Sequence, residues 1–254
     1  MLRFASLGSG SKGNATLIEA DGTRLLLDCG FSVSELERRL ARLDLDPAAL
    51  SAIVVTHEHA DHIGGVARLS RKYRLPVWLT VGTLNAARDR DFHDVECFHA
   101  HDVFAIDGIE LHPFPVPHDA REPCQFVFSD GRWRLGVLTD TGHITPHIQR
   151  SLDGCDALLL ECNYDTAMLA AGPYPPALKQ RVGGGLGHLA NTQAGELLRR
   201  MDITQLRHLI GMHVSENNNT TALAHRTLCE ALDCQEEWIE VACQVKGFGW
   251  RELS

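Results

Sequence analysis

The pattern of apolar and polar positions predicts strands and helices alternating along the whole chain. Short apolar runs bounded by Gly, Asn and Asp predict strands, and apolar residues at helical spacing predict helices. The predicted strands are Arg3–Leu7, Ala15–Glu19, Arg24–Leu27, Leu75–Leu79, Asp156–Leu160 and Leu206–Met212, with a mostly β region over 102–138 and a final hairpin over Trp238–Trp250. The predicted helices are Val33–Leu43, Val81–Arg90, Pro176–Val182, Thr192–Met201 and Thr221–Ala231. The simplest architecture for this order is two β-sheets packed face to face, with helices outside.

One short segment concentrates polar side chains directly after a predicted buried strand. Residues 57–62 read His-Glu-His-Ala-Asp-His. Side chains two positions apart on extended backbone point the same way, so His57 and His59 can bind one cation together. Asp61 and His62 lie past the turn and can face a second cation. Imidazole and carboxylate ligands suit zinc, with manganese or iron possible.

Three later strand ends offer further ligands, because one hexapeptide cannot saturate two cations. His118, Asp140 and His213 each come just after an apolar run. Strands of a sandwich bring such ends together at one edge. We therefore expect these three side chains to complete the site, although each taken alone is also consistent with ordinary surface polarity.

Composition narrows the classes of protein that fit. A chain of 254 residues with 44% hydrophobic residues suits one large domain or two fused halves. The net charge of −9 argues against a general nucleic-acid coat but does not exclude a nuclease. No segment approaches the length of an apolar membrane span and the first residues lack a signal-peptide pattern, which predicts a cytoplasmic protein without membrane partners. Eight cysteines without a C-x-x-C pair indicate reduced thiols.

The order of these residues resembles the metallo-β-lactamase superfamily over nearly the whole chain. The motifs that carry the resemblance are Leu26-Leu27-Asp28-Cys29-Gly30, residues 56–62, His118, Asp140 and His213. The resemblance implies an α+β fold, a four-layer αββα sandwich formed by a single domain over residues 1–254, with two divalent ions at one edge. It assigns His57, His59 and His118 to the first metal, Asp61, His62 and His213 to the second, Asp140 to a bridge, and Asp28 to the support of the histidine turn.

Two further segments resemble the tRNA-processing ribonucleases of this superfamily. They contain Glu161, in Leu158–Asn163, and His188, in Gly187–Asn191. In those enzymes the glutamate orients the histidine, which protonates the leaving oxygen, since a sugar oxygen leaves poorly until it is protonated. The resemblance therefore implies catalytic roles for His188 and Glu161, and for Asp61 in orienting a di-metal-bound hydroxide. The alternative interpretation is a capping glutamate and an ordinary loop histidine.

Several local motifs are similar to a smaller group, the WalJ/YycJ proteins, which are regarded as DNA exonucleases of 5′-to-3′ polarity. These motifs are residues 6–14, 25–28, 118–120, 138–142, 187–189 and 213–218. The chain departs from the pattern at Ala190, where Ser is expected, at Val214, where Leu is expected, and at Cys124, where a small residue near the mouth of the site is expected. Lys12 and Asn14 lie in a Gly-Ser loop that either donates to a phosphate or forms a plain solvated hairpin.

The sequence thus predicts a metal-dependent phosphodiesterase whose partner is nucleic acid, DNA rather than RNA. About seventy residues separate Asp140 from His213, too few for the second domain of the β-CASP nucleases. No Gly-rich arm for tRNA is evident, and residues 172–187 are expected to form a loop-rich insertion. Two alternatives remain open: a hydrolase of carbonyl substrates, such as a glyoxalase II-like thioesterase or a lactonase, and a non-catalytic metal-binding protein.

Overall fold

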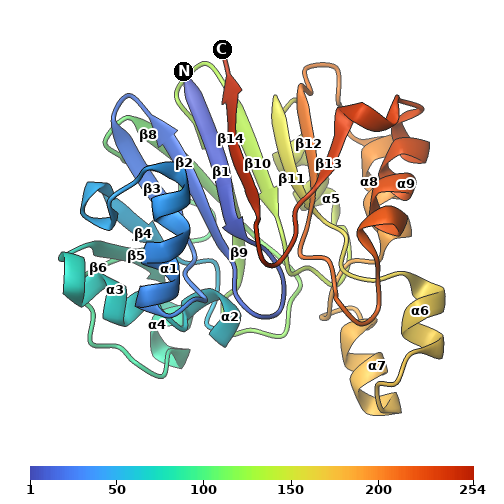
Figure 1. The fold of residues 1–254 in the computed structure, drawn as a ribbon, viewed down its shortest axis with the longest axis horizontal. Helices are drawn as coiled ribbons and strands as arrows, with labels where there is room; N and C mark the ends of the chain where they lie inside the picture. Colours follow the sequence, from blue (N-terminus) through green and yellow to red (C-terminus); the bar gives the residue numbers. More distant parts are fainter.

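Two seven-stranded sheets form the centre of the computed structural model, which describes residues 1–254 (Figure 1). The first sheet contains, in spatial order, β14 (Phe248–Leu253), β1 (Leu2–Gly8), β2 (Ala15–Ala20), β3 (Thr23–Leu27), β4 (Ala52–Val54), β5 (Pro76–Thr80) and β6 (Asp94–Phe98). The second contains β13 (Ile239–Val241), β12 (His208–Met212), β11 (Ala157–Glu161), β10 (Arg134–Leu138), β9 (Cys124–Ser129), β8 (Ile109–Pro115) and β7 (Phe104–Ile106).

Each sheet is antiparallel on one side and parallel on the other. Strands β3 to β6 are parallel in the first sheet, and strands β10 to β13 are parallel in the second. Neighbouring parallel strands end at the same edge of a sheet, so the loops that follow β4, β10, β11 and β12 gather there. This edge is the place where ligands bind in folds with parallel strands.

Helices cover the outer face of each sheet. Helices α1 (Val33–Leu40), α3 (Val66–Tyr73) and α4 (Val81–Ala86) contact the first sheet, and the short α2 (Ala60–Ile63) precedes α3. Helices α5 (Pro146–Leu152), α8 (Asn191–Arg200) and α9 (Thr221–Leu232) contact the second sheet. Helices α6 (Thr166–Ala171) and α7 (Pro176–Val182) project beyond the sandwich at the lower right of Figure 1. Three short 3-10 helices cover Ala41–Leu43, Pro47–Ala49 and Glu236–Trp238.

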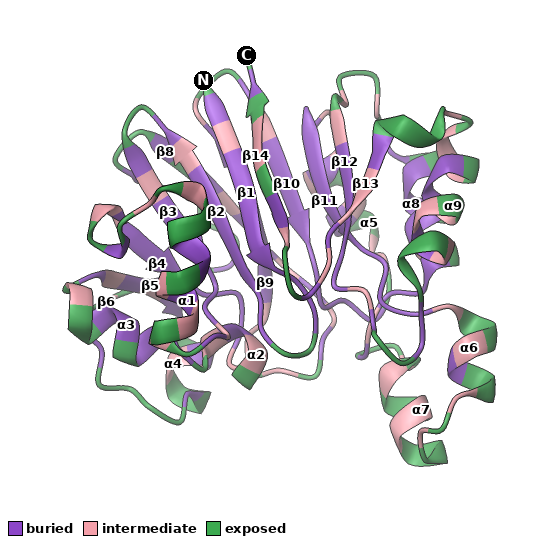
Figure 2. Ribbon diagram, in the orientation of Figure 1, coloured by how far each residue is buried: buried purple, intermediate pink, exposed green.

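Three large apolar clusters lie between the four layers. The largest lies between the sheets and includes Phe4 from the first sheet and Phe126 and Leu159 from the second. A second packs β-strands against helices α5, α8 and α9, and a third does the same for α1 and α3. Figure 2 shows the strands largely buried and the outward faces of the helices exposed. The expected αββα sandwich is therefore confirmed.

The structure corrects parts of the predicted element order. The final hairpin over Trp238–Trp250 is wrong, because β13 pairs in parallel with β12 while β14 pairs antiparallel with β1 in the other sheet. Strand β6 and helices α5 and α6 were not predicted, and α4 ends at Ala86 rather than Arg90. The 172–187 insertion contains the predicted helix α7. None of the helices has the length and apolar character that a membrane crossing requires.

Candidate metal centre and catalytic residues

The hexapeptide runs from the loop after β4 into α2, against the loop that follows β3. A Cβ atom on Gly30 would lie 1.9 Å from the carbonyl oxygen of Asp61, so only glycine permits this approach. The backbone N–H of Cys29 donates to the carbonyl oxygen of His62 (2.7 Å), and that of Asn14 to the carbonyl oxygen of Asp61 (2.8 Å). These contacts fix the loop backbone, and with it the directions of its side chains.

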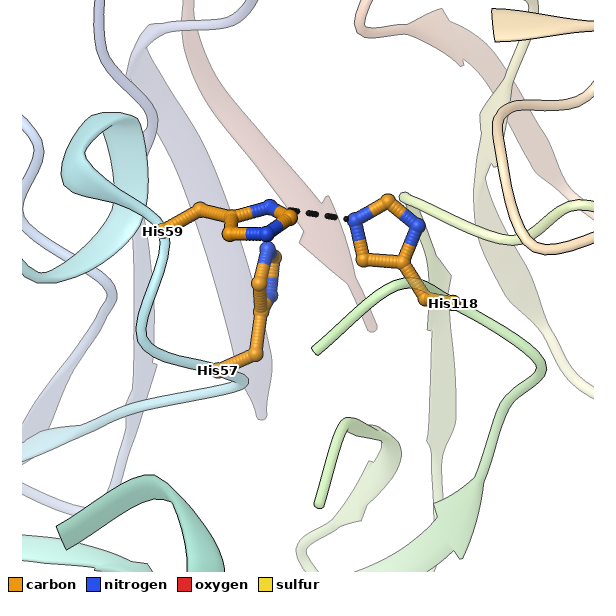
Figure 3. Close-up of side chains that lie close together, drawn as sticks. All are labelled: His57, His59 and His118. Carbon is orange, nitrogen blue, oxygen red and sulfur yellow. Dashed lines mark hydrogen bonds between the residues drawn. The ribbon is translucent and has the colours of Figure 1, made fainter. Parts of the chain in front are cut away.

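Three imidazoles from this loop and from the end of β8 face one another (Figure 3). We call His57, His59 and His118 the first group. Their ring centroids are 4.6–4.9 Å apart, and His59 Nδ1 lies 3.2 Å from His118 Nε2. Two nitrogens bound to one tetrahedral zinc ion lie about 3.3 Å apart. His57 Nε2 is buried without a hydrogen-bond partner, so the spacing and the unused nitrogen both fit a cation.

The opposite nitrogens of His118 and His59 are held by carbonyl oxygens. His118 Nδ1 donates to the Gly187 carbonyl (2.9 Å), and His59 Nε2 donates to the Asp119 carbonyl (3.2 Å). Each bond selects the tautomer whose other nitrogen presents a lone pair toward the centre of the group. Burial and the neighbouring His62 lower the pKa of His57 well below its usual range, which favours the neutral form that binds metal.

A second group, formed by Asp61, His62 and His213, lies beside the first. Asp140 lies close to both imidazoles of this group: its Oδ2 is 3.0 Å from His62 Nε2 and its Oδ1 is 2.9 Å from His213 Nδ1. Asp140 also groups with His57, so it is placed between the two sets. Despite these short distances, Asp140 Oδ2 and both nitrogens of His213 lack hydrogen-bond geometry. Buried polar atoms that converge without bonding one another are the arrangement expected for a cation-binding site.

Charges within this cluster change its proton affinity. Burial opposes ionisation of Asp140, but the charges of His213 and His62 lower its pKa well below the usual range. Burial lowers the pKa of His213, yet the charge of Asp140 and contact with Asp61 raise it to about 10. In the absence of other charges, protonated imidazoles therefore neutralise the buried carboxylate of Asp140. Because metal binding displaces protons from such ligands, a divalent cation can provide this positive charge in their place.

Asp28 supports the second group from behind. Its Oδ2 accepts from His62 Nδ1 (2.7 Å) and from Thr56 Oγ1 (2.8 Å), and its Oδ1 accepts from the Thr56 backbone N–H (2.9 Å). The side chain is buried, and with Nδ1 bound to Asp28 the other ring nitrogen, His62 Nε2, faces Asp140. A carboxylate behind a ligating imidazole fixes its orientation and raises its basicity. Sequence reasoning anticipated Asp28 but missed Thr56, which carries no signal beyond its position before the hexapeptide.

Glu161 and His188 form a hydrogen-bonded pair at the edge of the second group. His188 Nδ1 donates to Glu161 Oε1 (2.8 Å) and lies 3.3 Å from Asp140 Oδ1. Glu161 is fully buried, and its Oε2 accepts from the backbone N–H groups of Thr141 (2.9 Å) and Leu189 (3.3 Å). Burial lowers the pKa of His188, but the hydrogen bond to Glu161 raises it above the usual value. The arrangement favours an imidazole that retains a proton.

His188 reaches this position through a turn that we call the glycine strap, residues 183–187. The backbone of the strap lies so close to Gly142 that a Cβ atom there would be 2.3 Å from the Gly185 carbonyl. The Leu186 carbonyl accepts from the Asp119 backbone N–H (2.9 Å). His143, another histidine near Asp140, donates to the strap at Gly185 (2.9 Å) and belongs to no candidate metal group. Part of the 172–187 insertion thus positions His188 and buttresses His118.

The geometry revises two sequence expectations, for Cys124 and for Asn14. Cys124 is fully buried, with its thiol against the Thr56 carbonyl, rather than placed at the mouth of the site. Asn14 does not lie on a solvated hairpin: it is buried, and its amide nitrogen is 3.1 Å from His62 Nε2 and 3.4 Å from Asp61 Oδ2. It therefore supports the second group. Lys12 is exposed and pairs with a glutamate.

A sandwich of this kind, with clustered histidines and aspartates at its strand ends, defines a metal-dependent hydrolase. The profile of the Beta-lactamase superfamily domain matches residues 23–214, and the chain belongs to this superfamily, the metallo-β-lactamases. It is 34% identical over 240 residues to "Exodeoxyribonuclease YycJ" of Bacillus anthracis, covering 91% of this chain and 89% of that protein.

Two further comparisons extend this result. The chain is 32% identical over 236 residues to "Exodeoxyribonuclease WalJ" of Streptococcus pneumoniae, covering 91% of this chain and 88% of that protein. Among solved structures, zinc-bound PqqB of Methylobacterium extorquens superposes with a TM-score of 0.77 at 16% identity, covering 99% of this chain and all of the other. The second likeness supports the fold alone.

Proposed function

We propose that this chain is a DNA exonuclease of 5′-to-3′ polarity, acting as a single domain with two zinc ions. The first group, His57, His59 and His118, would hold one ion, and Asp61, His62 and His213 the other, with Asp140 between them. When bound, the ions supply Lewis acidity that polarises a phosphoryl oxygen and acidifies water. The names of the two exodeoxyribonuclease relatives support DNA as the substrate.

The observation that carries the proposal is the Glu161–His188 hydrogen bond of 2.8 Å beside the second group. Hydrolysis of a phosphodiester expels a sugar oxygen, which needs a proton, whereas a thioester releases a thiolate that leaves without one. Glu161 holds the Nδ1 proton of His188, which leaves Nε2 to carry the proton for the departing oxygen. Asp61, whose carboxylate is partly exposed at the site, orients the attacking water.

The test combines substrate choice with two histidine variants. We expect the protein, loaded with zinc or manganese, to shorten end-labelled DNA from its 5′ end and to hydrolyse bis-p-nitrophenyl phosphate rather than S-lactoylglutathione. His188→Ala should lower turnover by about 10²–10⁴-fold while bound metal stays unchanged. His147→Ala, at an exposed position on α5, is the matched control and should keep full activity.

The possible outcomes separate the alternatives. Loss of stoichiometric metal in His188→Ala would show that His188 is a ligand and not a proton donor. Preferential hydrolysis of S-lactoylglutathione would refute the nuclease proposal and favour a hydrolase of carbonyl substrates. Turnover of neither substrate by the fully metallated protein would favour a non-catalytic metal-binding role. Digestion of RNA in preference to DNA, or from the 3′ end, would correct the substrate or the polarity.

A further inference from the structure

A cavity of about 450 Å³ adjoins the first group without belonging to it. Helix α2 and the start of α3 form one side of it, and the end of α4 with the turn that follows forms the other; these helices lie together at the lower left of Figure 1. His59 belongs to the first group and also lines the cavity. We call this space the His59 cavity. Its volume falls within the range of small-molecule binding sites.

The inner surface of the His59 cavity is largely alkyl. Ala60, Ile63, Ala67 and Ala86 contribute its apolar wall, and the three alanines fill little of the space. Such a surface suits the face of a flat, weakly polar ring rather than a hydrated ion. A planar group inserted here would exchange water for alkyl contact along its face.

The charged residues that line the His59 cavity disfavour an anion there. Glu58 and Asp89 contribute two carboxylates, while Arg88 contributes one guanidinium. Glu58 Oε1 already accepts from the Arg121 backbone N–H (2.7 Å), and Asp89 pairs with Arg71 (3.1 Å). The two carboxylates would repel a phosphate, and only one guanidinium among the lining residues offsets them. A nucleobase is neutral, offers N–H donors to carboxylates, and presents a π face on which a guanidinium can stack.

We propose that the His59 cavity receives one nucleobase of the strand whose phosphodiester lies at the two metal-binding groups. This inference rests on the proposed nuclease function and identifies where a nucleotide next to the cleaved bond is recognised. The position of His59 supports this assignment, because this residue belongs to both the first group and the cavity. A nucleotide held by its phosphate need only extend past His59 to reach the alkyl surface. The side chain of His59 is 27% exposed, so its ring is accessible for that contact.

The experiment fills the cavity and removes single bases in parallel. Ala86 is exposed at the last position of α4, so Ala86→Trp can occupy the cavity without displacing the core. Asn85→Trp, also exposed on α4 but outside the cavity, is the matched control. Each protein is assayed on single-stranded DNA with an intact sequence and with one abasic site moved stepwise from the cleaved end.

Stacking of one base typically changes affinity by about 5- to 150-fold, which sets the expected size of the effect. We expect one abasic position to lower kcat/KM by such a factor in the wild type and in Asn85→Trp. In Ala86→Trp, intact DNA should show the same loss, with no further effect of that abasic site. Metal content and turnover of bis-p-nitrophenyl phosphate should match in all three proteins.

Two results would overturn the assignment. One is an abasic penalty that persists unchanged in Ala86→Trp, or that appears at no position. The other is an equal loss in Ala86→Trp and Asn85→Trp. A nuclease insensitive to all abasic sites would refute only the His59 cavity as a base site. Failure to cleave any oligonucleotide, together with turnover of S-lactoylglutathione, would refute the proposed function as well.

Discussion

The contact between Asp28 and His62 offers a way to weaken metal binding while keeping the fold. Asp28→Asn preserves the size of the side chain and can keep an oxygen toward the Thr56 backbone N–H, now 2.9 Å from Oδ1. It removes the charged acceptor 2.7 Å from His62 Nδ1. Loss of such a support typically costs about 10- to 100-fold in metal affinity, or roughly 1.4–2.7 kcal/mol.

Asp28→Ala should do more damage, because two further costs are added. Asp28 has a φ of 62°, a left-handed conformation that Asn tolerates and that costs Ala about 1–2 kcal/mol. Alanine also leaves the buried N–H groups of Thr56 and His62 without an acceptor, at about 1–3 kcal/mol each. We therefore expect Asp28→Asn to alter chiefly metal affinity, and Asp28→Ala to lower the free energy of unfolding of the metal-free protein as well.

Competition with a chromophoric chelator measures the zinc affinity, and urea unfolding of metal-free protein measures stability. Asp156→Asn is the control: Asp156 is also buried and also accepts from a backbone N–H, that of Arg134 (2.8 Å), but it belongs to no candidate metal group. It should leave zinc affinity unchanged. Wild-type zinc affinity in Asp28→Asn, or an equal loss in Asp156→Asn, would refute the supporting role.

Two other variants probe the loops that hold the site. Gln244 binds the 9–14 loop through two hydrogen bonds of 2.8 Å. Gln244→Ala should therefore lower the free energy of unfolding by about 1–3 kcal/mol and weaken zinc binding. Urea unfolding and chelator competition measure the two effects. Unchanged zinc affinity would show that this loop does not set the metal site. Gly142→Ala should displace the glycine strap and lower turnover at least about 10-fold while bound metal is retained. Gly249→Ala is the control, because a Cβ there meets nothing within 4 Å, and it should change neither turnover nor metal content. Full activity in Gly142→Ala would contradict the role of the strap.

Much of this site could be predicted because its residues follow strands. A ligand that comes directly after an apolar run, as His118, Asp140 and His213 do, is visible as a break from apolar to polar. The order of these breaks along the chain then matched one superfamily. The order of residues along the chain cannot show distances. The structure shows that Asp140 lies within 3.0 Å of the imidazoles of both His62 and His213.

The missed elements have physical explanations. The pattern over Trp238–Trp250 predicts two strands but not their partners, and the chain crosses between sheets within residues 242–247. Strand β6 lies at a sheet edge with most of its residues exposed, so it lacks the alternation that marks a half-buried strand. Supporting residues such as Gln244 are still harder to predict from sequence. The hydrogen-bond partner of Gln244, the backbone N–H of Lys12, lies 232 positions away in the sequence.

Backbone conformation at the site explains how the fold aims its ligands. Asp28, Asp140 and His213 all have left-handed φ values, of 62°, 51° and 52°. Each comes just past a strand, so the chain turns at once and the side chain is directed over the strand end. Such conformations cost about 1–3 kcal/mol each and persist only where neighbours fix them. For His213, the neighbours are Ser9, which accepts from its N–H (2.8 Å), and Asn163, which donates to its carbonyl (2.9 Å). These two hydrogen bonds hold the backbone of His213 in the left-handed conformation and so help to orient its imidazole toward the other ligands.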